Sequence, residues 1–121
     1  MKKITMEQFK AIRDIMDTYL NYNFDFICQV PNERARIAAA AWLYESRDRA
    51  VEAMKMNIDD GQKLARDDVC FMFYSTTYII NRTEEKVETS PDCDRKALLD
   101  AVEEYKALLE VIDSLFPEGI W

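Results

Sequence analysis

Residues 90–116 read SPDCDRKALLDAVEEYKALLEVIDSLF and hold the most regular apolar pattern in the chain. Large apolar side chains recur there at alternating spacings of four and three residues, the repeat of one helix face. These residues are Leu98, Val102, Tyr105, Leu109, Ile112 and Phe116. Ser90 and Pro91 precede the pattern, and a capping residue followed by proline favours the start of a helix. The stretch predicts a long helix that packs this face into a core, with Tyr105 largely buried.

Residues that break secondary structure are rare in the remainder of the chain. The 121 residues include two glycines and three prolines, against about 8 and 6 expected from average usage. Pro31, Gly61 and Pro91 divide the chain into long segments, which form helices far more readily than strands of about 5 to 6 residues. The sequence therefore predicts an all-α fold, a single-domain bundle of about four long helices over residues 1–121.

Two stretches leave a choice between helix and strand. Residues 22–30 alternate between apolar and polar side chains, and residues 69–80 are apolar almost all round with high strand propensity. We favour helix for the first because a lone strand would lack a partner. We favour helix for the second because Val69, Met72, Thr76 and Ile79 recur at helical spacing.

The ends of the helices are predicted from capping signals. Thr5 and Gln8 form a capping-box pattern ahead of the first apolar face. Pro31 and Asn32 favour the start of a second helix. The sequence Asp59-Asp60-Gly61-Gln62 is interpreted as the start of the third helix, and residues 83–89, rich in Glu and Lys, as the longest connection.

The formal net charge of −7 arises entirely in the last third of the chain. Residues 1–82 contain 12 acidic and 12 basic side chains, whereas residues 83–121 contain 11 acidic and 4 basic ones. A one-sided field attracts partners of opposite charge and repels polyanions. We therefore expect a basic protein as partner and no direct binding of nucleic acid. No stretch is apolar for long enough to span a bilayer, so no membrane partner is expected.

The absence of histidine excludes much enzyme chemistry. Ser-His and Cys-His nucleophile pairs, His-containing zinc sites and His-ligated haem all require imidazole. The three cysteines, Cys28, Cys70 and Cys93, are odd in number and widely spaced, which is typical of reduced thiols in a cytoplasmic protein. The twelve Phe and Tyr residues are attributed to core packing, since no window combines them with a basic groove.

Four carboxylates are candidate ligands of a metal site: Glu45, Asp48, Asp67 and Asp68. Helical Mg²⁺-dependent nucleotide pyrophosphatases use acids three residues apart on two neighbouring helices. Only Glu45 and Asp48 have that spacing here, because Cys70 and Phe71 follow three residues after Asp67 and Asp68. We predict no catalytic residue, no metal and no cofactor, and keep a carboxylate-dependent metal enzyme acting on nucleotides as an alternative.

The remaining candidate site is a set of nine acidic residues, called here the acidic set. Its members are Glu84, Glu85, Glu88, Asp92, Asp94, Asp100, Glu103, Glu104 and Glu110. Asp100, Glu103 and Glu110 fall on one outward stripe of the last predicted helix. We predict a non-enzymatic protein-binding module, a small acidic inhibitor of the anti-defence or toxin-immunity type. A structural subunit or homo-oligomer assembled through residues 61–82 is the further alternative.

Overall fold

Four α-helices make up most of the computed structural model, which describes residues 3–116. They are α1 (Met6–Ile27), α2 (Glu33–Asp60), α3 (Arg66–Thr89) and α4 (Asp92–Ser114). The described residues contain no strand, so the predicted all-α fold of four long helices is confirmed. Both ambiguous stretches are helical, except that residues 28–30 form the turn that leads to α2.

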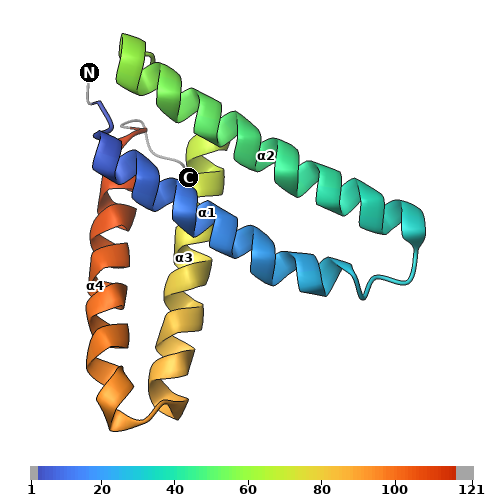
Figure 1. Cartoon of the computed structure of the whole chain (residues 1–121). Helices are drawn as coiled ribbons and strands as arrows, with labels where there is room; N and C mark the ends of the chain where they lie inside the picture. The colour runs from blue at the N-terminus through green and yellow to red at the C-terminus, as the bar shows by residue number, and fades with distance from the viewer. Residues whose placement is uncertain (1–2, 117–121) are drawn as a thin grey trace.

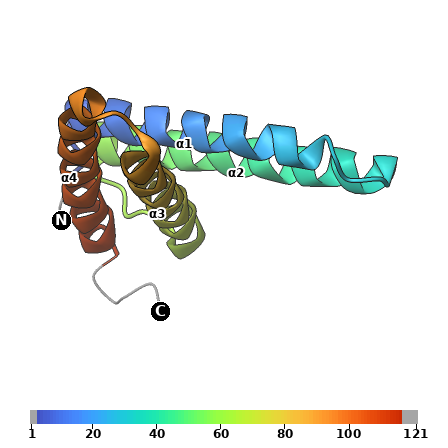
Figure 2. The ribbon, with the colours of Figure 1, turned by 90° about the horizontal axis from the view of Figure 1, so that it is seen from below.

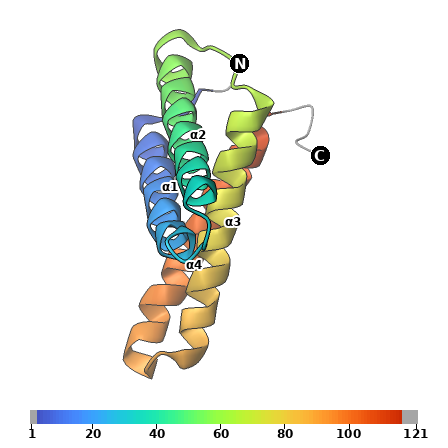
Figure 3. The same ribbon diagram turned by 90° about the vertical axis from the view of Figure 1, so that its right-hand side faces the viewer.

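The helices are arranged as two antiparallel hairpins that cross. Figure 1 shows α1 beside α2 and α3 beside α4, and Figure 2, seen from below, shows α3 and α4 running at a steep angle to α1 and α2. In Figure 3, α3 runs past both helices of the first hairpin, and it contacts α1, α2 and α4. Helix α3 is thus the element that connects the two hairpins.

Each hairpin extends beyond the crossing as an arm. Between Asn21 and Trp42, around the first turn, no side chain is buried, and the same holds from Asn81 to Ala101 around the second turn. The buried residues therefore concentrate where the hairpins cross. Both arms project from this region, as the far ends of the hairpins in Figure 1 show.

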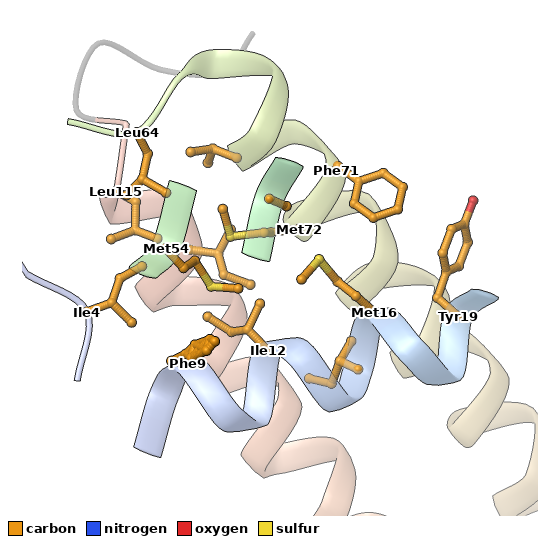
Figure 4. Packing of buried hydrophobic residues seen from close by; sticks show 14 of the residues in the cluster. Ile4, Phe9, Ile12, Met16, Tyr19, Met54, Leu64, Phe71, Met72 and Leu115 are labelled. Carbon is orange, nitrogen blue, oxygen red and sulfur yellow. The ribbon is translucent and has the colours of Figure 1, made fainter. Parts of the chain in front are cut away.

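The core at the crossing is built around methionine. Met16, Met54 and Met72, from α1, α2 and α3, are 0% exposed, and Figure 4 shows them among Ile4, Phe9, Ile12, Leu64 and Leu115. Helix α4 contributes Ile112, also fully buried. Burial of such side chains stabilises the fold by about 1.5 to 3 kcal/mol each, and one hydrophobic cluster holds all four helices.

The capping residues at two helix starts agree with the sequence. The Thr5 hydroxyl accepts a hydrogen bond from the N–H of Gln8, and the Gln8 side chain accepts one from the N–H of Thr5, both at 3.1 Å. Asn32 accepts a hydrogen bond from the N–H of Ala35 at 2.9 Å. These bonds satisfy amides that have no partner within the helix.

The predicted start of the third helix is wrong. Asp59 and Asp60 belong to the last turn of α2, and Gly61 ends that helix with a φ of 68°. Glycine adopts this left-handed conformation without the steric cost that a Cβ brings, and it is the commonest residue at this cap. Helix α3 begins only at Arg66, after Ala65 as its N-cap.

The predicted long connection over residues 83–89 is also wrong, because α3 continues to Thr89. The Thr83 hydroxyl donates to the carbonyl oxygen of Ile79 one turn earlier, and Arg82 lies 3.9 Å from Glu85. The i,i+3 ion pair favours helix in this polar stretch, and the bond to Ile79 gives the Thr83 hydroxyl a partner within the helix. The connection between α3 and α4 is therefore short, at Ser90 and Pro91.

Tyr105, which is predicted to be largely buried, is partly buried and packs against the hydrophobic core. Helix α4 contacts α3 along its length but is not enclosed by the other helices. Val102 and Ile112 are its buried residues, and Leu98 and Leu109 stay half-buried. The apolar face of α4 is therefore covered on the side of α3 and open on its flanks.

Candidate functional site

The acidic set lies entirely on the surface, and it forms two groups. All nine side chains are exposed. Glu84, Glu85, Glu88, Asp92 and Asp94 gather at the tip of the α3–α4 arm, and Asp100, Glu103, Glu104 and Glu110 lie along α4. Asp92 and Glu110 are about 27 Å apart along the helix axis, at 1.5 Å per residue. The nine acids therefore do not form one continuous patch.

Basic neighbours offset part of the charge at the arm tip. Arg95 lies 3.3 Å from Asp92, and Lys96 lies 3.9 Å from Asp100. Exposed pairs of this kind contribute about 0 to 1 kcal/mol. Glu103, Glu104 and Glu110 have no ion pair with a described residue. Glu84, Glu88 and Asp94 at the tip likewise form no ion pair with a described residue, so uncompensated negative charge remains both at the arm tip and along α4.

One of these acids borders a groove between α1, α3 and α4. The groove has a volume of about 240 Å³. Its lining residues are Ala11, Asp14, Ile15, Thr18, Ile79, Glu104, Tyr105 and Leu108. Two carboxylates thus lie beside an apolar surface, and Asp14 has Arg13 at 3.6 Å. We call this feature the acidic groove.

Glu110 borders a different hollow. It lines a space of about 300 Å³ together with Phe73, Leu109 and Asp113. Glu104 and Glu110 therefore border separate hollows, so the acids along α4 do not line one common surface. The acidic groove is the one that combines acids from two helices that are distant in the sequence.

A second recess lies where α1, α2 and α3 meet. It has a volume of about 330 Å³ and combines aromatic with charged side chains. Its lining residues are Tyr19, Trp42, Ser46, Arg49, Asp67, Asp68, Cys70, Phe71 and Tyr74. We call it the aromatic cleft.

The aromatic rings of the cleft pack edge to face. The Tyr19 ring lies 5.8 Å from Phe71 and 5.6 Å from Tyr74 between centroids, and Trp42 lies 6.5 Å from Phe71. Figure 4 shows Tyr19 and Phe71 at the edge of the core. Burial, together with the neighbouring phenols of Tyr74 and Tyr78, raises the pKa of Tyr19 to about 12. Tyr19 is therefore a neutral phenol at physiological pH.

The charged side of the cleft contains two carboxylates and one guanidinium. Burial raises the pKa of Asp68, the charge of Arg49 lowers it in part, and the charge of Asp67 raises it further. Neither Asp67, Asp68 nor Arg49 forms an ion pair within 4 Å with any described residue. The cleft thus holds one carboxylate more than it holds guanidinium groups, and none of the three forms a direct ion pair with a described residue.

The carboxylates weighed as a metal site do not share one location. Asp67 and Asp68 line the aromatic cleft, whereas Asp48 lies 3.1 Å from Arg47 and Glu45 is exposed on α2. Within residues 3–116, no three His, Cys, Asp or Glu side chains gather closely enough to hold a metal ion. The three cysteines are free thiols.

Reasoning from the sequence missed the aromatic cleft. Tyr74 is among the Phe and Tyr residues attributed to the core, yet it is 59% exposed, and Trp42, for which no role is predicted, is 60% exposed. The signal available was the mixture of Trp42 with polar neighbours on its helix, and of Asp67 and Asp68 with aromatics on theirs. That signal is weak, because the cleft depends on how the helices cross.

Comparisons with known proteins do not assign the chain. No protein-family model matches it, and no curated protein or solved structure is significantly similar to it. Across residues 3–116, none of the helices has the length and apolar character of a membrane span. The acidic groove and the aromatic cleft are therefore the candidate functional sites of the described chain.

Proposed function

We propose that this chain is a non-enzymatic protein-binding module that docks the acidic face of α4 on a basic surface of a partner protein. We expect this basic surface to be one with which the partner binds nucleic acid. An acidic protein that covers such a surface competes with the phosphate backbone and acts as an inhibitor.

The observation that carries the proposal is the acidic groove. Protein interfaces need an apolar centre with a polar rim, since charge alone gives little affinity. Leu108 and Ala11, which are partly exposed, supply apolar surface in the groove, and Glu104 and Asp14 supply carboxylates. The long aliphatic stem of a lysine or arginine can pack on this apolar surface while its charged head group meets the carboxylates.

The half-buried ring of Tyr105 supports the same surface. Tyrosine is enriched in interfaces because one end is apolar and the other forms hydrogen bonds. Asp100 and Glu103 are exposed on the same helix within one turn of Glu104. Together they extend the negative field beyond the groove, which speeds the encounter with a basic partner.

The other hypotheses have less support. An oligomer through residues 61–82 would need a broad exposed apolar surface there, but Val69, Met72 and Ile79 are buried in the protein's own core. Tyr74 is the large exposed hydrophobic side chain of that stretch within the described residues. For a metal enzyme, the weighed carboxylates are dispersed. No specific observation favours either hypothesis over binding.

The test compares two triple variants of equal charge change. The partner is first isolated with the tagged protein and identified by mass spectrometry. Surface plasmon resonance then measures the variant Asp100→Lys/Glu103→Lys/Glu104→Lys against the partner. We expect a large fall in the association rate, weaker binding at high salt for the wild type, and an unchanged melting temperature, since all three side chains are exposed.

The matched control is Glu84→Lys/Glu85→Lys/Glu88→Lys at the arm tip. It changes the net charge equally but leaves the acidic groove intact. A clearly smaller loss of association rate in this control supports the groove as the docking site. Equal losses in both variants would mean that only the total charge matters, and kinetics that do not respond to salt would overturn the proposal.

A further inference from the structure

We propose that the aromatic cleft is a binding site for an arginine side chain presented by another polypeptide. The cleft shares no residue with the acidic groove, so this inference does not depend on the proposed function. Its aromatic walls, its charges without a direct ion pair and its small opening all favour such a ligand.

The walls suit a planar cation. Trp42, Phe71 and Tyr74 line the cleft, and the two edge-to-face contacts hold the rings at fixed angles of 83° between Trp42 and Phe71 and 88° between Tyr19 and Tyr74. A guanidinium group stacks on aromatic faces and is more weakly hydrated than an ammonium group. Arginine is therefore preferred here over lysine.

The charges favour a cation over an anion. Asp67 and Asp68 together outweigh Arg49, and none of the three has an ion pair within 4 Å in the described chain. Carboxylates bind the guanidinium fork through two parallel hydrogen bonds. Burial already disfavours the charge on Asp68, so an incoming cation compensates a carboxylate that the free protein leaves short of partners.

The opening favours a side chain carried by a polypeptide over a small free ligand. A volume of about 330 Å³ is near the lower limit of ligand pockets, which hold about 300 to 1,000 Å³. The walls Trp42 and Tyr74 are also more than half exposed. Exposed aromatic surface beside a small pocket offers contact area to the residues that flank an anchor.

The direct test is calorimetric titration with three probes. They are a blocked Gly-Arg-Gly peptide, the same peptide with citrulline in place of arginine, and free L-arginine amide. Citrulline has nearly the same shape but no charge. We expect the arginine peptide to bind at least about fivefold more tightly than the citrulline peptide, as a cation–π contact and an ion pair predict. Equal binding of these two peptides would overturn the proposal.

The free amide tests the source of the guanidinium. We expect it to bind at least about threefold more weakly than the peptide, because it lacks the flanking contacts with the exposed rim. Equal affinity of amide and peptide would instead assign the cleft to a small free guanidinium compound, against the proposal.

Three variants test the sign of the charge effect. Asp68→Asn and Trp42→Leu should each weaken arginine-peptide binding by about fivefold. Arg49→Ala should strengthen it, because the variant removes a like charge from the cleft. Weaker binding in Arg49→Ala would show that the cleft holds an anion or a zwitterion. Trp42 and Arg49 are exposed, so melting temperatures serve as the check that these variants fold.

Discussion

The side-chain oxygen Oδ1 of Asn57 accepts a hydrogen bond of 2.8 Å from the backbone N–H of Ile4. Asn57 is 1% exposed, and its Nδ2 donates to the carbonyl oxygen of Gln62 at 2.9 Å. One buried amide thus connects the segment before α1, the end of α2 and the connection to α3. A buried amide is favourable only when its own hydrogen bonds are made.

We expect Asn57→Leu to destabilise the protein by about 1 to 3 kcal/mol, because Ile4 and Gln62 would each lose a partner in a buried place. Urea denaturation with an unchanged m-value measures this loss. The control is Asn21→Leu on the surface of α1, which should stay within about 0.5 kcal/mol of the wild type. A similar small effect for Asn57→Leu would contradict the structural role of the amide.

Two positions on the apolar face of α4 differ in burial and therefore predict an order of stability effects. Ile112 is fully buried, and Ile112→Ala should cost about 2 to 5 kcal/mol through the cavity it leaves. Tyr105 is half-buried, so Tyr105→Ala should cost less than Ile112→Ala, within the usual range of about 0.5 to 3 kcal/mol. Chemical denaturation of both variants decides the order. A larger loss for Tyr105→Ala would mean that the flank of α4 is covered.

The raised pKa of Asp68 predicts a pH-dependent stability. Asp68 binds its proton more tightly in the folded protein than in the unfolded chain. As the pH rises above the ordinary carboxyl pKa, the contribution of Asp68 to the free energy of unfolding therefore falls. Asp68→Asn should therefore raise the melting temperature at about pH 7 and give no such gain at about pH 3, where the wild type is protonated. Calorimetry at both values, with the exposed Glu52→Gln as control, tests this. An equal gain at both values would disprove the assignment.

Helix formation could be predicted from the sequence because the signals are local. The apolar repeat from Leu98 to Phe116 and the capping box at Thr5 need only neighbouring residues. The error at Gly61 had a physical cause as well. Acidic residues are typical of the start of a helix, but a glycine that can adopt the left-handed conformation is a stronger signal, and it indicates the end of a helix.

The crossing of the hairpins could not be predicted, because it depends on contacts between distant segments. A regular apolar face on α4 indicates burial but does not say how many neighbours cover it, and Leu98 and Leu109 stay half-buried. The aromatic cleft has the same origin. Trp42 and Tyr74 lie on different helices, and only the crossing brings them together. The locations of the acidic residues on the surface followed more directly, since charged side chains are seldom buried.

The three methionines at the crossing have a consequence for oxidation chemistry. Oxidation converts a thioether into a polar sulfoxide, which an apolar core does not accommodate. Met16, Met54 and Met72 are sealed while the hairpins stay together, whereas Met6 and Met56 are 53% and 39% exposed. Peroxide reaches the exposed pair in the folded protein but reaches the sealed three only when the hairpins separate. The difference in oxidation rate between the exposed and the buried methionines therefore reports how often the two hairpins separate.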